Sequence, residues 1–403
     1  MTGSNSTMQN HRPTAIDLFC GAGGMSLGFE QAGFDIVSAV EIDPIHAAVH
    51  KYNFPVCNTI CGDIAELTGK DLCFGKEIDV LFGGPPCQGF SLMGKRDMSD
   101  PRNDLLYQFM RLVEEIKPKY FVMENVSGLT IGDAKDFLMR VIDDIELSGY
   151  RVVKPYRVLN AKDFGVPQSR QRLFLLGYRK GQAEPIYPVI DDSKLTVKDA
   201  IYDLPNIDDF NELKELDKIC YLVEPISDYA KKLHGSMIDP FDFSYERKWE
   251  NHVLTGCLRT QHTKGSTDRF KSTDEGNVEP ISRFLKLNPS GICNTLRAGT
   301  DKSRGAYTSP RPIHPRDNRC ISVREAQRLH SFPDWFRMHS TKWHGFREVG
   351  NSVPPLLARA VAAQIMSALN VIPVKPKAKI ELGNEQFLYL NLTSARTLLE
   401  AIG

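Results

Sequence analysis

The chain has 403 residues, of which 41% are hydrophobic and 25% are charged, and its 50 basic and 50 acidic side chains give a formal net charge of +0. This length suits two domains of an ordinary globular protein. No apolar run approaches the ~20 residues of a membrane span, and the polar N-terminus lacks the core of a signal peptide, so we expect a cytoplasmic protein without a membrane partner. The neutral total removes any whole-chain argument for a nucleic-acid partner.

Charge is nevertheless distributed unevenly along the second half of the chain. Residues 191–250 carry 8 Lys and Arg against 15 Asp and Glu, whereas residues 251–350 carry 17 against 9. A basic segment is where a phosphate backbone is expected to lie, although a solvated basic face gives the same pattern.

The first half of the chain alternates short apolar runs with amphipathic segments. Strands are expected at 15–19, 36–41, 79–82, 120–123 and 173–177, and helices as far as Gln31 and at 44–52, 105–116 and 134–147. This alternation predicts an α/β fold with a parallel, doubly wound sheet, whose ligands bind beyond the carboxyl ends of the strands. From about residue 180 to residue 315, turn-forming residues predict an irregular second unit, before helical spacing returns at 322–331, 355–368 and 394–401.

The first strand is followed by a glycine-rich turn, Gly-Ala-Gly-Gly at residues 21–24. Such a turn lets a ligand approach the backbone, and an acidic residue about 20 positions later, here Glu41, is placed to bind ribose hydroxyls. A nicotinamide oxidoreductase is one interpretation, but Ser26 replaces the third glycine of that fingerprint. Asp63 follows a third strand end, and two acidic strand ends without a basic partner suit a nucleoside that lacks a phosphate, such as S-adenosylmethionine.

A cysteine follows another strand end, in the sequence Gly-Gly-Pro-Pro-Cys-Gln at residues 83–88. Two prolines stiffen the approach to Cys87 and the glycines permit a tight turn, which presents a thiol; a buried structural cysteine would not need this backbone. Glu124 ends the next strand and is therefore expected next to it. Arg170 and Arg172 have the spacing of one strand face.

Six segments together resemble the successive motifs of the cytosine-5 DNA methyltransferase family, in order and spacing, between about residues 14 and 368. They read Asp-Leu-Phe-Cys-Gly-Ala-Gly-Gly at 17–24, Pro-Pro-Cys-Gln at 85–88, Glu-Asn-Val at 124–126, Gln-Ser-Arg-Gln-Arg at 168–172, Arg-Glu-Ala-Gln-Arg-Leu at 324–329 with Phe-Pro at 332–333, and Gly-Asn-Ser-Val-Pro-Pro at 350–355. The resemblance implies a doubly wound S-adenosylmethionine-dependent methyltransferase sheet with a smaller, irregular target-recognition domain.

The resemblance also implies how the chemistry is divided among the residues. Cys87 supplies a thiolate that adds to C6 of cytosine, Glu124 bonds N3 and the exocyclic amine, and Arg172 binds O2, together with Arg170. The target base must leave the duplex, because its C5 atom is out of reach in the stack. On the cofactor side, the family places these residues around S-adenosylmethionine: Phe19 near adenine, Gly21 and Gly23 in the turn, Glu41 at ribose, Asp63 at adenine, and Asn351 and Val353 beside the cofactor. The alternative for 351–355 is a plain helix N-terminus, since Asn and Ser are good caps.

We therefore expect a catalytic and cofactor-binding domain at 1–185, a target-recognition domain at 186–320, a segment at 321–375 that returns to the catalytic domain, and an extension of unknown role at 376–403. The expected partner is duplex DNA, bound by a monomer in a bacterial restriction–modification system with a separately acting restriction endonuclease. No metal is expected, because Cys57, Cys61 and Cys73 have neither a CxxC pair nor a nearby His.

Two further interpretations remain open. An RNA cytosine-5 methyltransferase would keep the chemistry, but the long segment between Arg172 and Arg324 argues for a reader of duplex DNA. A non-catalytic DNA-binding regulator on the same scaffold would not need the complete set of Cys87, Glu124 and Arg172.

Overall fold

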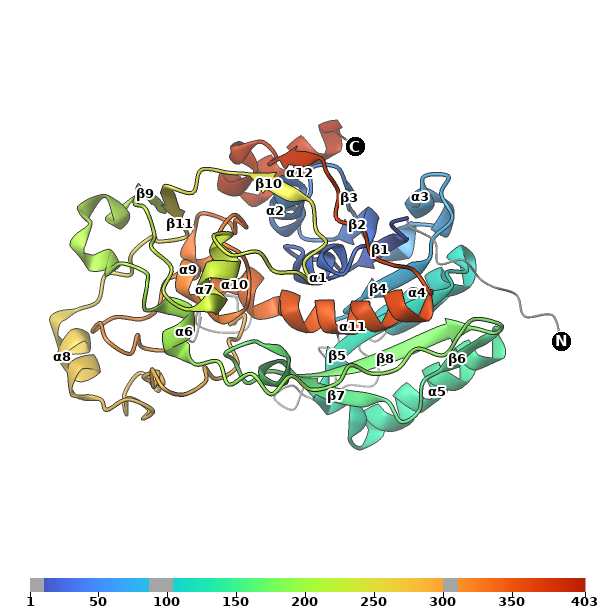
Figure 1. Cartoon of the computed structure of the whole chain (residues 1–403), viewed down its shortest axis with the longest axis horizontal. Helices are drawn as coiled ribbons and strands as arrows, with labels where there is room; N and C mark the ends of the chain where they lie inside the picture. The colour runs from blue at the N-terminus through green and yellow to red at the C-terminus, as the bar shows by residue number, and fades with distance from the viewer. Residues whose placement is uncertain (1–10, 87–103, 300–310, 403) are drawn as a thin grey trace.

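The fold is built on a mixed sheet of eight strands. The structure, a computed structural model, describes residues 11–86, 104–299 and 311–402 (Figure 1). The strand order is β3-β2-β1-β4-β5-β8-β6, and β7 also pairs with β8. The strands are β1 (Thr14–Leu18), β2 (Asp35–Glu41), β3 (Asn58–Cys61), β4 (Val80–Gly83), β5 (Tyr120–Val126), β6 (Tyr150–Val152), β7 (Arg157–Asn160) and β8 (Gln171–Arg179).

The first five strands are parallel, as the alternation predicts, but the expectation of a wholly parallel sheet is wrong for the remaining strands. β8 runs antiparallel to β5, β6 and β7. The reason is the short connection of residues 161–170 between β7 and β8, which reverses the chain where a parallel pair would need a crossover helix. β8 therefore lies between β5 and β6, and its first residues return to the edge at which β5 ends.

Helices cover both faces of the sheet because successive strand residues point to opposite sides. On β4 and β5, Val80, Phe82 and Val122 belong to one buried cluster, whereas Leu81 and Phe121 belong to the other. The first cluster includes α1 (Gly24–Gln31), α2 (Pro44–Asn53) and α11 (Pro355–Ala368); the second includes α3 (Gly69–Cys73), α4 (Asp104–Ile116) and α5 (Asp133–Leu147).

The middle of the chain is irregular, as expected, but it shares the core of the sheet domain. Its regular elements are α6 (Val197–Ile201), β9 (Lys218–Cys220), α7 (Asp228–His234), β10 (Glu246–Lys248), β11 (Val253–Thr255) and α8 (Lys264–Ser272). Buried side chains such as Leu204, Leu254 and Leu287 belong to the same cluster as α1 and α11. The buried guanidinium of Arg247 also donates to both carboxylate oxygens of Glu30 in α1, at 2.8 and 2.9 Å.

The C-terminal part adds α9 (Val323–Leu329), α10 (Lys342–Asn351), α11, β12 (Lys379–Glu381) and α12 (Leu392–Ile402). α10 was not anticipated from the sequence. It overturns the capping interpretation of 351–355, because Asn351 ends α10 and the residue before α11 is Pro354, which makes no side-chain cap. The extension is ordered against the rest of the chain: β12 pairs with β10, and α12 lies by α2 (Figure 1).

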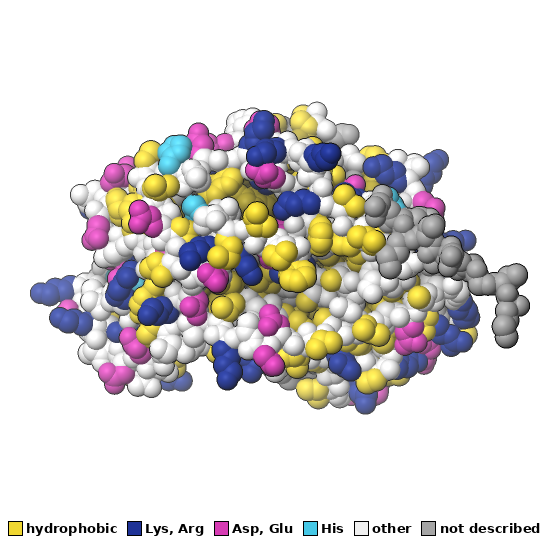
Figure 2. Space-filling view, in the orientation of Figure 1, with side chains coloured by type: hydrophobic (Ala, Val, Ile, Leu, Met, Phe, Trp, Pro, Cys, Tyr) yellow, Lys and Arg dark blue, Asp and Glu magenta, His cyan; other side chains and the backbone are white. Residues whose placement is uncertain are grey.

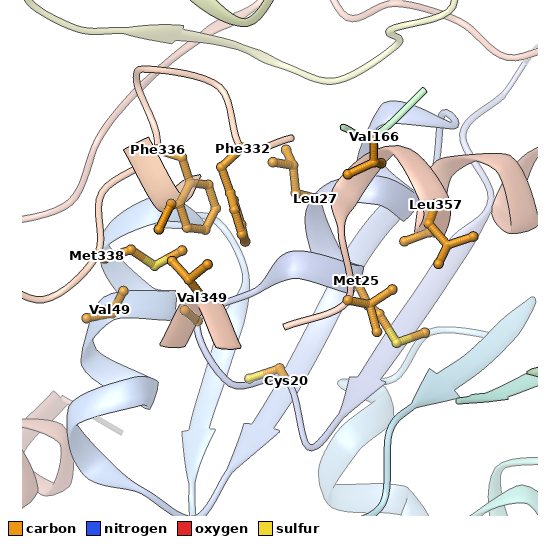
Figure 3. Close-up of a cluster of buried hydrophobic side chains, with 14 of the residues drawn as sticks. Cys20, Met25, Leu27, Val49, Val166, Phe332, Phe336, Met338, Val349 and Leu357 are labelled. Atoms are coloured by element: carbon orange, nitrogen blue, oxygen red, sulfur yellow. The ribbon is translucent and has the colours of Figure 1, made fainter. Parts of the chain in front are cut away.

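A shared core fixes the C-terminal part against the first helix. Figure 3 shows Phe332, Phe336 and Leu357 in one buried group with Met25 and Leu27 of α1. The glycine-rich turn that precedes α1 therefore has a packed partner from the other end of the chain. Within the described parts of the chain, no helix is both long and apolar enough to span a bilayer.

Candidate active site

The carboxyl ends of three neighbouring strands meet at one edge of the sheet. Leu18 pairs with Gly83, and Gly83 pairs with Met123. The segments that follow these residues are the glycine-rich turn, the start of the cysteine loop and the Glu-Asn-Val motif, so they are neighbours in space. Because β8 is antiparallel, its first residues lie at the same edge.

At this edge Glu124 and Arg172 form a nearly buried ion pair. Arg172 Nε lies 2.8 Å from Glu124 Oε1, and the two side chains are 17% and 12% exposed. The strand register explains the contact. Arg172 pairs with Val126, and Val126 lies on the same face of β5 as Glu124 because the two are two residues apart. Arg172 Nη1 also donates to the carbonyl of Gln171, at 2.7 Å.

Burial raises the pKa of Glu124 above its ordinary value, and the nearby Arg172 and Arg170 oppose that rise. The raised pKa makes proton uptake by this carboxyl group easier than it is in water. The site thus contains an acid whose protonated form is accessible, with a cation held against one of its oxygens.

The start of the cysteine loop is fixed against this pair. Asn125 Nδ2 donates to the carbonyl of Pro85, at 3.0 Å. Gly84 lies so close to the acid that a Cβ at that position would be 2.7 Å from Glu124 Oε2, so a larger residue would require the carboxyl group to shift. Cys87 itself lies outside the described residues, and the described chain before it runs directly beside Glu124.

Arg170 lies in a different setting from Arg172. It is only 1% exposed, and its guanidinium donates to the carbonyls of Leu296, at 2.9 Å, and Gly350, at 2.7 Å. The described hydrogen bonds of Arg170 therefore tie three segments of the chain together. This setting favours a positioning role for Arg170 over contact with a substrate.

The glycine-rich turn contacts Glu41 where β1 and β2 end. Phe19 and Gly21 have positive φ values of 64° and 54°, and a Cβ at Gly21 would meet no atom within 4 Å. Gly23 has a φ of 103°, in the left-handed region that favours glycine. Glu41 closes the turn, because its carboxylate accepts from the N–H of Gly21 at 2.8 Å and of Asp43 at 2.9 Å. Its remaining lone pairs can accept hydroxyl donors.

The next strand end supplies another acid and an apolar surface. Asp63 accepts from the N–H of Ala65 at 2.9 Å and is exposed. Ile42, next to Glu41, exposes 64% of its surface. An exposed isoleucine at a strand end offers a flat ligand an apolar face. Ile42 could not be recognised from the sequence, because sequence alone does not show on which side of the strand end a residue emerges.

The segment at 351–353 lies against the beginning of α1. A Cβ on Gly24 would be 2.5 Å from the carbonyl oxygen of Val353 and 2.9 Å from Ser352 Cβ. Val353 is buried, whereas Asn351 is exposed at the end of α10. The structure thus brings these residues to the turn that Gly21 and Glu41 form.

A separate hollow of about 580 Å³ lies along the outer side of α11. Figure 2 shows hydrophobic side chains gathered across the middle of the face on which α11 lies in Figure 1. The hollow is lined by residues such as Phe164, Phe241 and Leu356, and by none of the site residues above, so the chemistry belongs to the sheet edge.

Many cations of the basic segment 251–350 are engaged within the protein. The ion pairs join Arg259 to Asp208, Arg269 to Glu279, Arg319 to Glu325, Arg328 to Asp203 and Asp334, and Arg337 to Asp217. The expectation that this segment as a whole marks a phosphate-binding surface is therefore too broad.

Comparisons with known proteins identify the family of the chain. The C-5 cytosine-specific DNA methylase family matches residues 14–367. The chain is 55% identical over 392 residues to the Type II methyltransferase M.XorII of Xanthomonas oryzae pv. oryzae, covering 96% of this chain and 92% of the relative. It is 33% identical to M.DdeI of Desulfomicrobium norvegicum, over 87% of this chain and 88% of that protein.

Solved structures show the same fold. A putative DNA modification methyltransferase encoded within an Escherichia coli prophage is 34% identical with a TM-score of 0.72, over 89% of this chain and 99% of that one. The Dnmt2 methyltransferase of S. pombe shares the fold at 17% identity and a TM-score of 0.55, over 89% of this chain and 100% of that one. The chain belongs to the C-5 cytosine-specific DNA methylase family and is an S-adenosylmethionine-dependent DNA (cytosine-5-)-methyltransferase.

Proposed function

We propose that the chain methylates cytosine within one specific duplex sequence, by drawing the target base out of the helix and forming a transient bond between Cys87 and C6. The observation that carries the proposal is the buried pair of Glu124 and Arg172, 2.8 Å apart, beside the fixed beginning of the cysteine loop. A paired acid and cation at this depth suit a planar, polar base that must be bound and protonated.

The proposed reaction begins with addition of the Cys87 thiolate to C6, which turns C5 into the nucleophilic carbon of an enamine. A free thiol with a pKa of ~8.5 is mostly protonated at neutral pH, so the addition needs assistance from the base-binding residues. Attack of C5 on the methyl group forms the new carbon–carbon bond and breaks the S–CH3 bond, whose electron pair stays on the sulfur as the sulfonium becomes a neutral thioether. The C5 proton then leaves to a base, and the electron pair of that C–H bond expels the Cys87 thiolate.

Glu124 is the proposed acid that bonds N3 and the exocyclic amine. Burial raises its pKa, which favours the protonated form that donates to N3. Arg172 is the proposed partner of O2 and neutralises charge that develops on the ring. We assign Arg170 to holding the strand that carries Arg172, because its hydrogen bonds go to two backbone carbonyls.

The glycine-rich turn and the acids at the strand ends suit S-adenosylmethionine, which would supply a methyl group on a sulfonium. Glu41 is the proposed ribose ligand, and Asp63 is the proposed partner of the adenine amino group. Phe19 and Ile42 offer apolar surface for the adenine ring. Gly21 leaves room for a ligand, because a Cβ there would meet no atom within 4 Å, whereas Gly23 lets the turn pack closely against Phe54. Asn351 and Val353 are the proposed residues that approach the cofactor from the side of α1.

Residues 186–320 are the proposed target-recognition domain, with 1–185 and 321–375 forming the catalytic unit and 376–403 buttressing α2. The irregular segment contains exposed hairpins and loops and no residue of the proposed chemistry. The named relatives are Type II methyltransferases, so we infer that the chain protects its host's DNA alongside a separate restriction endonuclease. The proposed acting form is a monomer.

Replacement of Cys87 by Ser tests this function directly. We expect Cys87→Ser to lose methyl transfer to duplex DNA while binding S-adenosylmethionine as the wild type does, because the proposed cofactor-binding residues are unchanged. Tritium transfer from labelled cofactor measures the first quantity and calorimetry the second. Transfer to tRNA in preference to duplex DNA would favour the RNA alternative, and substantial activity of the variant on DNA would remove Cys87 from the mechanism.

A further inference from the structure

A buried group of three side chains, Gln168, Arg170 and His330, joins the two halves of the proposed active site. We call this group the junction. Gln168 and Arg170 precede β8 and Arg172, whereas His330 follows α9. All three side chains are at most 1% exposed.

His330 uses both of its ring nitrogens. Its Nδ1 lies 2.9 Å from Gln168 Nε2, and its Nε2 lies 3.0 Å from the carbonyl oxygen of Ser352. An amide nitrogen can only donate and a carbonyl oxygen can only accept, so Nδ1 is the acceptor and Nε2 carries the proton. His330 is therefore neutral, with one hydrogen bond toward each side of the site.

Three partners fix the orientation of Gln168. Its Oε1 accepts from the N–H of Leu296 at 3.1 Å, and its Nε2 donates to the carbonyl of Leu329 at 3.2 Å as well as to His330. Reversing the amide would place a donor against the N–H of Leu296. The acceptor role of His330 Nδ1 is thereby imposed by its surroundings.

The hydrogen bonds of the junction converge on the segment that contacts the glycine-rich turn. Arg170 holds the carbonyl of Gly350 at 2.7 Å, and His330 holds that of Ser352, so both neighbours of Asn351 are fixed. Ser352 in turn packs on the beginning of α1, 2.9 Å from a Cβ built on Gly24. A displacement of Ser352 is therefore transmitted directly to the glycine-rich turn.

We propose that His330 is a positioning residue that keeps the cofactor segment 351–353 in register with the strand that carries Arg172. The Nε2–H of His330 fixes the segment 351–353 by donating to the carbonyl of Ser352. The Nδ1 atom of His330 accepts from Gln168 and so fixes the segment that leads into β8 and Arg172. The inference rests on the proposed roles of Arg172 and of 351–353. It adds a residue that touches neither substrate nor cofactor and yet sets both pockets.

Two substitutions at this position separate hydrogen bonding from packing. His330→Leu fills the space but offers neither a donor nor an acceptor. His330→Gln offers one of each on its amide end and restores both hydrogen bonds. We expect His330→Leu to weaken equilibrium binding of S-adenosylmethionine by about tenfold and to lower kcat at saturating substrates, the scale of one unsatisfied buried polar group; His330→Gln stays within about threefold of the wild type in both.

His339 provides a matched control. It is also a buried histidine that bonds a backbone carbonyl, that of Leu390 at 3.0 Å, and a second partner, Thr341, at 2.9 Å. These contacts reach the C-terminal extension and not the cofactor segment. His339→Leu is expected to lower the melting temperature as His330→Leu does, while leaving cofactor binding and kcat unchanged.

The outcomes are decisive in either direction. Unchanged cofactor binding in His330→Leu, equal defects in His330→Gln and His330→Leu, or an equal cofactor defect in His339→Leu would each overturn the proposal. Should His330→Leu fail to fold, Gln168→Met removes the donor to Nδ1 from the opposite side and is expected to weaken cofactor binding in the same way. Because calorimetric binding needs no turnover, this test remains valid even if Cys87→Ser retained activity and the proposed mechanism failed.

Discussion

Asp17 lies near the end of β1, shortly before the glycine-rich turn, and its side chain is buried, with 1% of the residue exposed. Ser26 Oγ donates to its Oδ2 at 2.5 Å and lies 3.0 Å from His50 Nε2. Burial raises the pKa of Asp17 to about 8, with the Ser26 hydrogen bond opposing the rise and Glu41 adding to it. The carboxyl group therefore remains largely protonated at neutral pH.

This raised pKa predicts a pH dependence of stability. The unfolded carboxyl ionises near pH 3.9 and the folded one near pH 8, so the folded state binds one more proton between these values, and stability falls as pH rises through that window. We expect the wild type to lose about 3 kcal/mol relative to Asp17→Asn between pH 6 and pH 9. Urea unfolding at the two pH values measures the difference. A difference that is independent of pH would show that Asp17 is already ionised at pH 6.

Glu124→Gln tests the proton donated to N3. The amide can still bond N3 and the exocyclic amine but cannot transfer a proton, so we expect kcat to fall by about 10²–10⁴-fold while affinity for target DNA is kept. Single-turnover methylation and fluorescence anisotropy provide the two numbers. A variant with kcat within about threefold of the wild type would argue against acid catalysis by Glu124.

At the scale of elements, a hairpin at 276–286 presents an arginine from the proposed recognition segment. Its ends pair through Gly276 and Lys286, at 2.8 Å, and the Glu279 carboxylate accepts from the N–H of Ile281 at 3.1 Å. Arg283 is exposed near the tip with a φ of 62°. A strained backbone held by an internal cap presents this side chain in one direction.

We expect Arg283→Ala to weaken binding of target duplex by about 1–3 kcal/mol, the value of a direct contact between an arginine and a base, with no change in cofactor binding. The matched control is Arg140→Ala, which removes an exposed arginine from α5 on the helical layer of the sheet. Anisotropy titrations of both variants give the comparison. Equal DNA affinity of Arg283→Ala and the wild type would exclude this hairpin from the DNA contact.

The sequence predicts helices and strands well where one apolar periodicity dominates, and poorly where an element depends on contacts with residues far away in the chain. The strands before Phe19 and Glu41 and the helix at 355–368 have clear apolar periods, and the structure contains them. The sequence did not predict α10, because the helix Lys-Trp-His-Gly-Phe-Arg-Glu-Val-Gly-Asn is largely polar and only part of it is buried against α9. The direction of β8 depends on the short return from β7, which periodicity does not encode.

For the site, the sequence indicated Glu124 and Glu41 as strand-end residues and Arg172 by its spacing from Arg170, and the structure places Glu124, Arg172 and Glu41 at the same edge of the sheet. It did not indicate that Asn125 holds Pro85 or that His330 joins the two pockets. These contacts join residues that are 40 and 162 positions apart, and no local pattern encodes such pairs.

At the scale of the whole molecule, the acidic and basic segments neutralise each other. Asp203, Asp208 and Asp217 come from the acidic stretch 191–250, and their partners Arg328, Arg259 and Arg337 come from 251–350. The uneven charge in the sequence is thus partly the signature of internal ion pairs. DNA contacts are expected among the exposed cations, such as Arg283, and not among these.

Arg328→Met tests this structural role. Arg328 is fully buried, with Nη2 2.6 Å from Asp334 Oδ2 and Nη1 3.2 Å from Asp203 Oδ2. Removing the cation leaves the buried carboxyl group of Asp203 without this partner and Asp334 with only Arg324, at 3.6 Å, so we expect a loss of about 3–5 kcal/mol in the free energy of unfolding. Urea denaturation measures it. A loss below about 1 kcal/mol would contradict the view that this cation is structural.

The central claim of a Cys87 adduct is tested most directly by trapping it. Duplex DNA with 5-fluorocytosine at the target, once bisulfite sequencing has identified that target, retains fluorine where the C5 proton must leave, so elimination stalls after methyl transfer. We predict a band of protein bound to DNA on a denaturing gel that requires S-adenosylmethionine, is present for the wild type and is absent for Cys87→Ser. A wild-type protein that methylates ordinary target DNA but forms no such band would contradict covalent catalysis by Cys87.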